Sequence, residues 1–222
     1  MERVRRAAEG GGRDPAGVRV VAVTKGVDLA TVRAAFDAGM ATFGESRVQE
    51  ARAKVDALPS AEWHLVGRLQ ANKARAAVRA FRVIHSVDCV ALLARLDRVA
   101  GEEQHRPDVL LQVNVTGEPS KAGFDAEALA SGAAHQDLVA AIRAARHVGV
   151  VGLMTIAPLV ARPGEARPVF ARLRTLRDTL QQRLGAPLRE LSMGMSGDLE
   201  AGVAEGATMV RVGTAIFGLR RR

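Results

Sequence analysis

The sequence of 222 residues contains one cysteine, Cys89, no tyrosine and only 3% aromatic residues. A lone cysteine excludes a disulfide within the chain and a zinc site built from several cysteines. Because the N-terminus also shows no apolar signal region, we expect a cytoplasmic location. Few aromatic side chains argue against a stacking surface for bases, although the formal net charge is +8. We therefore expect no nucleic-acid partner. No stretch reaches the roughly 18 apolar residues of a membrane span, so we expect no membrane partner either.

Lysine is equally scarce, since only four of the 32 basic side chains are lysines: Lys25, Lys54, Lys73 and Lys121. Lys25 closes an apolar run that begins at Val18. A desolvated lysine is able to lose its proton and attack a carbonyl, which arginine cannot do. From position alone, Lys25 is equally consistent with a strand end whose side chain extends to water.

Short β-type runs alternate with helical stretches along the chain. We expect strands at residues 19–24, 41–43, 63–66, 83–86, 109–115, 148–155, 189–192 and 208–212. We expect helices between them at residues 29–38, 46–57, 72–80, 90–100, 138–146, 165–184 and 198–205. This alternation predicts an α/β fold, namely a single (β/α)8 TIM-type barrel.

We expect this barrel to form one domain of residues 1–222 with an extra N-terminal helix. A flexible connection at residues 10–13 should join the helix to the barrel, and residues 130–134 should form a surface loop. The alternative is a doubly wound open sheet. That fold would place a Gly-rich fingerprint after the first strand, and residues 24–28 lack it.

Two loops near the C-terminus are suited to an anion. Barrels of this kind commonly hold a phosphate in the loops after strands seven and eight. Ser196 precedes the helix expected after strand seven, and Gly213 and Thr214 follow strand eight. Ordinary capping is the alternative explanation for these residues. We expect Asp198 to cap its helix and to point away from the anion.

Arg211 and the histidines complete the candidate residues. Strand alternation places Arg211 on the same side as Gly213. If that side faces the inside of the barrel, burial of the charge is costly, and Arg211 would need a ligand or an internal salt bridge as its partner. His64 and His85 lie in strands and are interpreted as satisfied core residues. The five histidines show no metal-ligand spacing, and we expect no metal site.

Several segments together form a recognisable pattern: residues 21–25, 43–45 with 48–50, 63–73, 112–114 with 121–123, 152–156, 191–198 and 210–218. Met193-Gly194-Met195-Ser196 and Arg211-Val212-Gly213-Thr214 are the most specific blocks. In these segments the sequence resembles the pyridoxal phosphate homeostasis proteins, whose fold is like the N-terminal barrel domain of alanine racemase. The resemblance extends over nearly the whole chain.

The resemblance implies a role for each candidate residue. Lys25 would hold pyridoxal 5′-phosphate covalently as an internal aldimine. Ser196, Gly213 and Thr214 would hold its phosphate, and Arg211 would face its pyridine nitrogen. An arginine there keeps that nitrogen largely unprotonated and weakens the ring as an electron sink. Lys73 and Lys121 stay open between a second, weaker cofactor contact and plain surface charge.

The family implies a protein that stores, buffers or delivers the cofactor, with PLP-dependent apo-enzymes as recipients, and a closed barrel would suffice as a monomer. A racemase-like PLP enzyme acting on amino acids is the alternative. The absence of tyrosine and of a second domain counts against it, so we expect no catalysis. A Schiff-base aldolase is a third hypothesis. Two departures from the family pattern are Ser46-Arg47 after Gly44-Glu45, which puts one contact near the cofactor in doubt, and Thr24 in place of serine.

Overall fold

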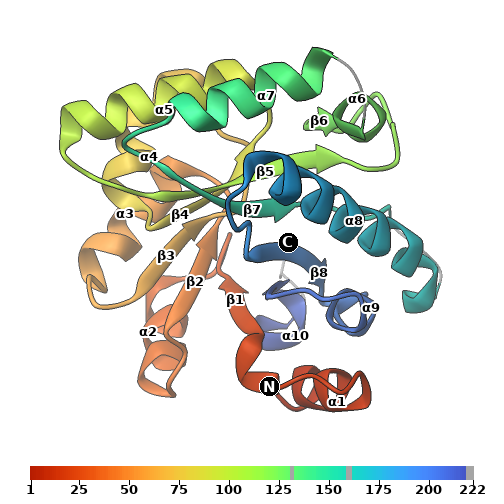
Figure 1. Cartoon of the computed structure of the whole chain (residues 1–222). Coiled ribbons are helices and arrows are strands. Elements are labelled where there is room, and N and C mark those ends of the chain that lie inside the picture. Colours follow the sequence, from red (N-terminus) through yellow and green to blue (C-terminus); the bar gives the residue numbers. More distant parts are fainter. Residues whose placement is uncertain (131–132, 159–161, 219–222) are drawn as a thin grey trace.

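The computed structural model describes residues 1–130, 133–158 and 162–218 (Figure 1). Within these residues, eight parallel strands close into a barrel: β1 (Arg19–Val23), β2 (Thr42–Glu45), β3 (Glu62–Leu65), β4 (Val83–Val87), β5 (Asp108–Asn114), β7 (Gly149–Met154), β8 (Glu190–Met195) and β9 (Met209–Val212). β1 pairs with β9, and β4 pairs with β5, which closes the ring. The predicted TIM-type barrel is therefore confirmed.

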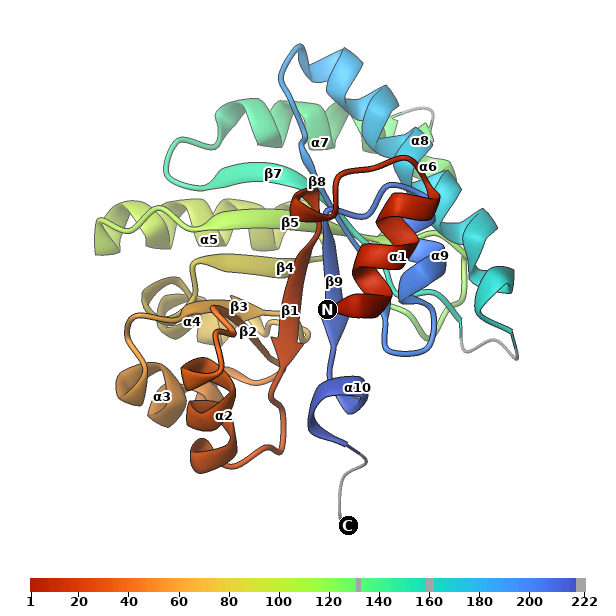
Figure 2. The ribbon, with the colours of Figure 1, turned by 90° about the horizontal axis from the view of Figure 1, so that it is seen from below.

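Helices surround the strands in the expected alternation (Figures 1 and 2). They are α2 (Leu29–Asp37), α3 (Val48–Ala57), α4 (Ala74–Ala80), α5 (Val90–Glu103), α7 (Ala133–Ala144), α8 (Arg167–Leu184), α9 (Leu199–Ala204) and α10 (Thr214–Phe217). Local signals set several ends. Asp28 caps α2 by accepting from the Thr31 N–H at 2.8 Å, and α8 stops at Gly185, where φ is +66°.

The segment after β5 differs from the prediction. A short strand, β6 (Phe124–Asp125), and a short helix, α6 (Ala126–Ala130), precede α7. The surface loop expected at 130–134 was wrong at both ends, because Ala130 closes α6 and Ala133 opens α7; residues 131–132 lie outside the described residues. Alanine favours a helix at these positions, and that propensity outweighs the small, polar composition of the segment.

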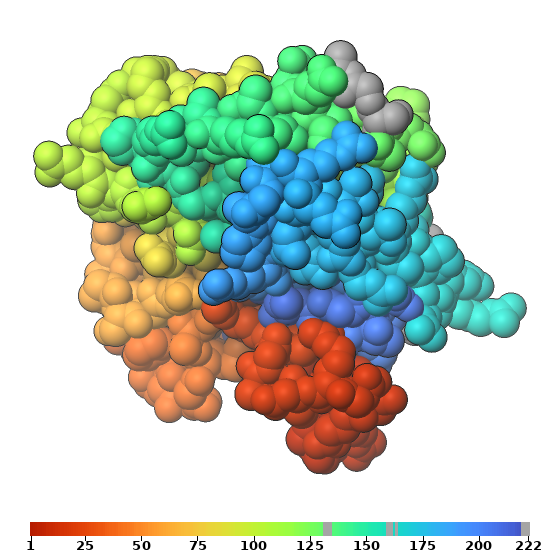
Figure 3. All heavy atoms as spheres, in the orientation of Figure 1, coloured from red at the N-terminus to blue at the C-terminus, as the bar shows by residue number. Residues whose placement is uncertain are grey.

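The extra N-terminal helix, α1 (Glu2–Gly10), is confirmed and packs against α9 (Figures 1 and 2). Arg3 forms an ion pair with Glu200 of α9 and donates to the Ser196 carbonyl oxygen at 3.0 Å. Figure 3 shows these N-terminal residues packed against the C-terminal part of the chain. The helix therefore supports the loop that follows β8.

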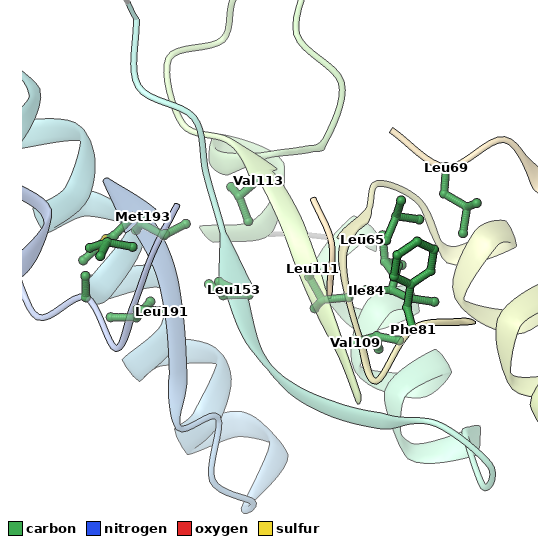
Figure 4. Close-up of a cluster of buried hydrophobic side chains, with 14 of the residues drawn as sticks. Leu65, Leu69, Phe81, Ile84, Val109, Leu111, Val113, Leu153, Leu191 and Met193 are labelled. Carbon is green, nitrogen blue, oxygen red and sulfur yellow. The ribbon is translucent and has the colours of Figure 1, made fainter. Parts of the chain in front are cut away.

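The hydrophobic core has two layers. One lies between the strands and the helices and includes Leu111, Leu153, Leu191 and Met193 (Figure 4). The other fills the barrel and includes Val83, Leu110 and Met154. Register partners in a parallel sheet point to the same side, and residues of one strand alternate between the two sides. Adjacent residues of β5 therefore enter different layers, Leu110 the inner one and Leu111 the outer one.

Candidate functional site

Lys25 lies in the turn directly after β1 and is exposed. Val21 is the register partner of Arg211, whose side chain bonds residues inside the barrel, so Val21 and Val23 also point inward. Lys25 lies two residues after Val23, in the turn at the carboxyl end of the strand. Its position is that of a reactive group at a barrel mouth. Lys54 and Lys121, in contrast, are held in ion pairs with Glu45 and Glu118.

Gly213 and Thr214 lie beside Lys25 because β9 is the neighbour of β1. Together with Asp28 and Phe217, these three residues line a hollow of about 270 Å³. Gly213 packs closely on β1, since a methyl group added to it would lie 3.4 Å from the Val23 carbonyl oxygen. α10 begins at Thr214, and its Ile216 and Phe217 N–H groups both donate to the Gly213 carbonyl oxygen at 2.9 Å.

Ser196 joins the same region from the loop after β8. Its Oγ accepts a hydrogen bond from the Ala215 N–H at 3.3 Å, so the two loops chosen from the sequence are in contact. Two glycines bring this loop close to its helix. Gly194 has a φ of +94°, and a methyl group on Gly202 would lie only 2.8 Å from the Met193 carbonyl oxygen. The backbone of α9 therefore packs directly on the end of β8.

The expected side-chain cap from Asp198 is not formed. Asp198 occupies the N-cap position of α9, but its side chain makes no capping hydrogen bond. Its carboxylate instead accepts from the Met195 N–H at 2.5 Å, back toward the end of β8. A tight turn from Met195 to Asp198, closed by the Asp198 N–H to the Met195 carbonyl at 3.1 Å, gives the carboxylate this nearer donor.

Arg211 is inside the barrel below Gly213 and is only 5% exposed. Its Nη1 donates to the Ser192 carbonyl oxygen at 2.8 Å and to Ser192 Oγ at 2.6 Å, and its Nη2 donates to the Thr155 carbonyl oxygen at 2.8 Å. In the described part of the chain its partners are neutral oxygens rather than a carboxylate. Burial lowers the pKa of Arg211 to about 10, and the charge of Asp198 opposes that shift. The guanidinium therefore remains charged at neutral pH.

Arg211 keeps a donor for a ligand. A guanidinium has five N–H groups, and the protein contacts use three of them, all on the Nη atoms. The Nε atom is not among the polar atoms that are sealed from solvent without a partner. Among the described residues, the Nε–H and one Nη2–H of Arg211 therefore have no protein acceptor.

Other residues showed no such convergence. Two larger hollows of about 580 and 620 Å³ lie beside α3 and contain Lys73, but none of the five predicted site residues lines them. His64 and His85 are buried with hydrogen-bond partners, as interpreted from the sequence. Within residues 1–130, 133–158 and 162–218, no group of three or more His, Cys, Asp or Glu side chains is placed to hold a metal ion. Across the same residues, no helix combines the length and apolar character needed to cross a membrane.

Sequence comparisons place this geometry among known proteins. Residues 2–221 match the family described as alanine racemase, N-terminal domain. The chain is 43% identical to a pyridoxal phosphate homeostasis protein of a Synechocystis species, over 93% of each chain. It is 42% identical to the protein of the same name from Pseudomonas aeruginosa, over 98% of this chain and 91% of that one.

Solved structures agree with the sequence matches. PipY of Synechococcus elongatus, solved with PLP bound, is 44% identical to this chain with a TM-score of 0.82. The match covers 97% of this chain and 100% of the PipY chain. An alanine racemase from Clostridium difficile shares the fold with a TM-score of 0.72 at 11% identity. This chain spans only 56% of that racemase.

Proposed function

The chain belongs to the pyridoxal phosphate homeostasis proteins, within the wider family of alanine racemase N-terminal domains, and we propose that it binds pyridoxal 5′-phosphate and stores, buffers or delivers it. The observation that carries the proposal is the convergence of Lys25, Gly213 and Thr214 on one hollow, with Ser196 in contact with the same loop. Arg211 lies beneath that loop with a donor still available.

The residues present fit this cofactor. Lys25 is exposed at the mouth and would bond to the aldehyde carbon with loss of water. Ser196 and Thr214 supply hydroxyl groups that are suited to a phosphate. The bound cofactor supplies an aldehyde and an electron-accepting ring. Ser46-Arg47 lines a separate hollow beside α3, so we propose that it makes no contact with the cofactor.

Arg211 argues for storage rather than catalysis. The guanidinium remains charged and acts only as a donor, so a ring nitrogen that accepts from it is not protonated. An unprotonated ring is a weak electron sink, and amino-acid chemistry on this cofactor depends on that sink. We therefore propose a carrier that holds the cofactor without turning over a substrate.

The racemase alternative lacks a residue that it would need. The sequence has no tyrosine to act as the second base opposite Lys25. The five site residues all come from one chain, so we propose that a monomer is sufficient. PLP-dependent apo-enzymes are the proposed recipients, and a cytoplasmic location remains a prediction.

Absorbance spectroscopy tests this function. The purified protein incubated with pyridoxal phosphate and freed of excess should retain a visible absorption band. The loaded protein should then leave a panel of amino acids unchanged and should restore activity to a PLP-dependent apo-enzyme. A protein that gains no band would refute cofactor binding. Racemisation or transamination of any amino acid in the panel would refute the carrier role.

A further inference from the structure

A hydrogen-bonded chain runs through the barrel from Arg211 to its opposite face. Arg211 Nη1 donates to Ser192 Oγ at 2.6 Å, and Ser192 Oγ lies 2.8 Å from His85 Nδ1. His85 Nε2 lies 2.9 Å from His64 Nδ1, and His64 Nε2 lies 2.8 Å from Glu62 Oε1. Glu62 begins β3, so the chain ends at the N-terminal rim of the barrel.

The middle residues of this hydrogen-bonded series are fully buried. His64, His85 and Ser192 are each 0% exposed. His64 has Val83 as its register partner, and Ser192 has Met154, and both partners belong to the apolar filling of the barrel. Polar groups buried in such surroundings are costly unless each hydrogen bond is made, so the chain has one stable arrangement of protons.

The two ends fix the direction of that arrangement. Arg211 can only donate, so the hydroxyl hydrogen of Ser192 is available for His85 Nδ1. An ionised Glu62 can only accept, so His64 Nε2 carries the hydrogen that it receives. His85 Nε2 must then donate to His64 Nδ1. Both rings are therefore neutral Nε2–H tautomers, and all four hydrogen bonds point from Arg211 toward Glu62.

Charges around the chain agree with this direction. Burial lowers the pKa of His64 and of His85, which keeps both rings neutral. The hydrogen bond from His64 lowers the pKa of Glu62, which keeps it ionised. Arg19 Nη1 lies 3.3 Å from Glu62 Oε1. Arg82, Asp108 and Glu190 line the same rim. In the opposite direction, the lone pair of His64 Nε2 would face the carboxylate.

We propose that Ser192, His85, His64 and Glu62 are positioning residues for Arg211, and that Glu62, at the far end of the barrel, sets the direction of the three hydrogen bonds that link it to Ser192, whose hydroxyl oxygen holds the guanidinium. The effect of these residues on cofactor binding, a fixed contact between Arg211 and the cofactor ring, rests on the proposed function. The arrangement of protons does not depend on the cofactor.

The first test uses the cofactor-free protein. Long-range proton–nitrogen NMR of the histidine rings should show Nε2–H tautomers for both His64 and His85. Glu62→Gln offers both a donor and an acceptor, so it should produce a mixture of tautomers in both rings. Asp108→Asn changes a carboxylate on the same rim outside the chain and should leave both tautomers unchanged. An Nδ1–H tautomer on either ring of the native protein, or unchanged rings in the Glu62 variant, would overturn the proposal.

The second test measures the consequence for pyridoxal phosphate. Ser192→Ala removes the hydroxyl and leaves Arg211 its backbone acceptors, whereas Ser192→Thr keeps the hydroxyl. The alanine variant should bind the cofactor about tenfold more weakly and shift the band of the bound cofactor, and the threonine variant should restore both. Equal affinity and spectra in both variants and the native protein would overturn the positioning role. A native protein that binds no pyridoxal phosphate would instead refute the proposed function. The tautomers of His64 and His85 would still test the proposed direction of the hydrogen bonds from Arg211 to Glu62.

Discussion

Lys54 Nζ lies 2.7 Å from Glu45 Oε1 and also donates to the Thr24 carbonyl oxygen at 2.7 Å, directly before Lys25. Glu45 is fully buried, and its Oε2 has no partner in the described part of the chain. Removing the lysine would leave a buried carboxylate without a counter-charge. We expect Lys54→Met to lower the free energy of unfolding by about 3–5 kcal/mol, measured by urea denaturation.

The double variant Lys54→Met with Glu45→Leu removes both charges and should recover most of that loss. Arg52→Met is the matched control on the same helix, because Arg52 is exposed and its ion pair with Asp56 spans 3.8 Å. A Lys54→Met protein as stable as the Arg52→Met protein would show that the buried pair does not support the end of β1.

Acid should destabilise the protein through its two buried histidines. Burial lowers the pKa of His64 and His85 below the value of 6.5 that they have when unfolded. As the pH falls below 6.5, the unfolded chain binds protons that the folded chain does not, so stability decreases until the folded pKa is reached. Each ring should cost about 1.4 kcal/mol per pH unit in that window. Urea unfolding at a series of pH values measures the slope.

The slope should become shallower in a His64→Leu variant and should persist in His105→Gln, whose ring is exposed. The lowered pKa of Glu62 adds stability that is lost only at lower pH, as its carboxylate becomes protonated. An unfolding free energy that stays constant between neutral pH and the acid edge of this window would contradict the assignment of neutral rings.

Close backbone packing under the Ser196 loop gives a third prediction. A methyl group on Gly202 would lie 2.8 Å from the Met193 carbonyl oxygen and 3.1 Å from Gly194 Cα. Gly202→Ala should push α9 away from β8, cost about 1–3 kcal/mol of stability and weaken pyridoxal phosphate binding. Gly17→Ala, whose added methyl group meets no atom within 4 Å, should change neither quantity. Identical denaturation and binding curves for the two variants would rule out the tight contact.

The phosphate contacts are tested by comparing pyridoxal phosphate with pyridoxal. Ser196→Ala and Thr214→Val each remove a hydroxyl proposed to bind the phosphate, and each should weaken the phosphorylated ligand by about tenfold or more. Pyridoxal lacks the phosphate, so its binding should stay unchanged. Thr175→Val, on the exposed side of α8, is the control for both ligands. Variants that weaken both ligands equally would place the phosphate elsewhere.

The barrel could be predicted because its signals are local. β-Branched runs alternate with alanine- and arginine-rich stretches, and the polar residues gather after the strands, as at Lys25 and Ser196. The β6–α6 segment could not be predicted in the same way, because a two-residue strand leaves no periodic pattern. It forms by pairing Phe124 with Val113 of β5, a contact that only the folded chain creates.

The site was predictable in part for a similar reason. Simple alternation indicates an inward Arg211, and the structure places its side chain inside the barrel, although β9 ends at Val212 and Gly213 already begins the turn into α10. The series of hydrogen bonds from Arg211 to Glu62 was not predictable, because register shifts interrupt the alternation of side chains in two of the strands. The shifts lie in β4 between Ile84 and Val87 and in β8 between Ser192 and Met195. Glu45 falls between the strand expected at residues 41–43 and the helix expected at 46–57, but it ends β2 in the structure. Its pairing with Lys54 depends on a long side chain that reaches from α3 to the barrel wall.

The central claim is that Lys25 is the residue that holds the cofactor. Incubation with pyridoxal phosphate, reduction with borohydride and mass spectrometry of the peptides measure it most directly. We expect the pyridoxyl group on Lys25, no visible band in Lys25→Ala, and an unchanged labelling site in Lys73→Ala. A group found on Lys54, Lys73 or Lys121 in place of Lys25, or no labelled peptide at all, would contradict the account.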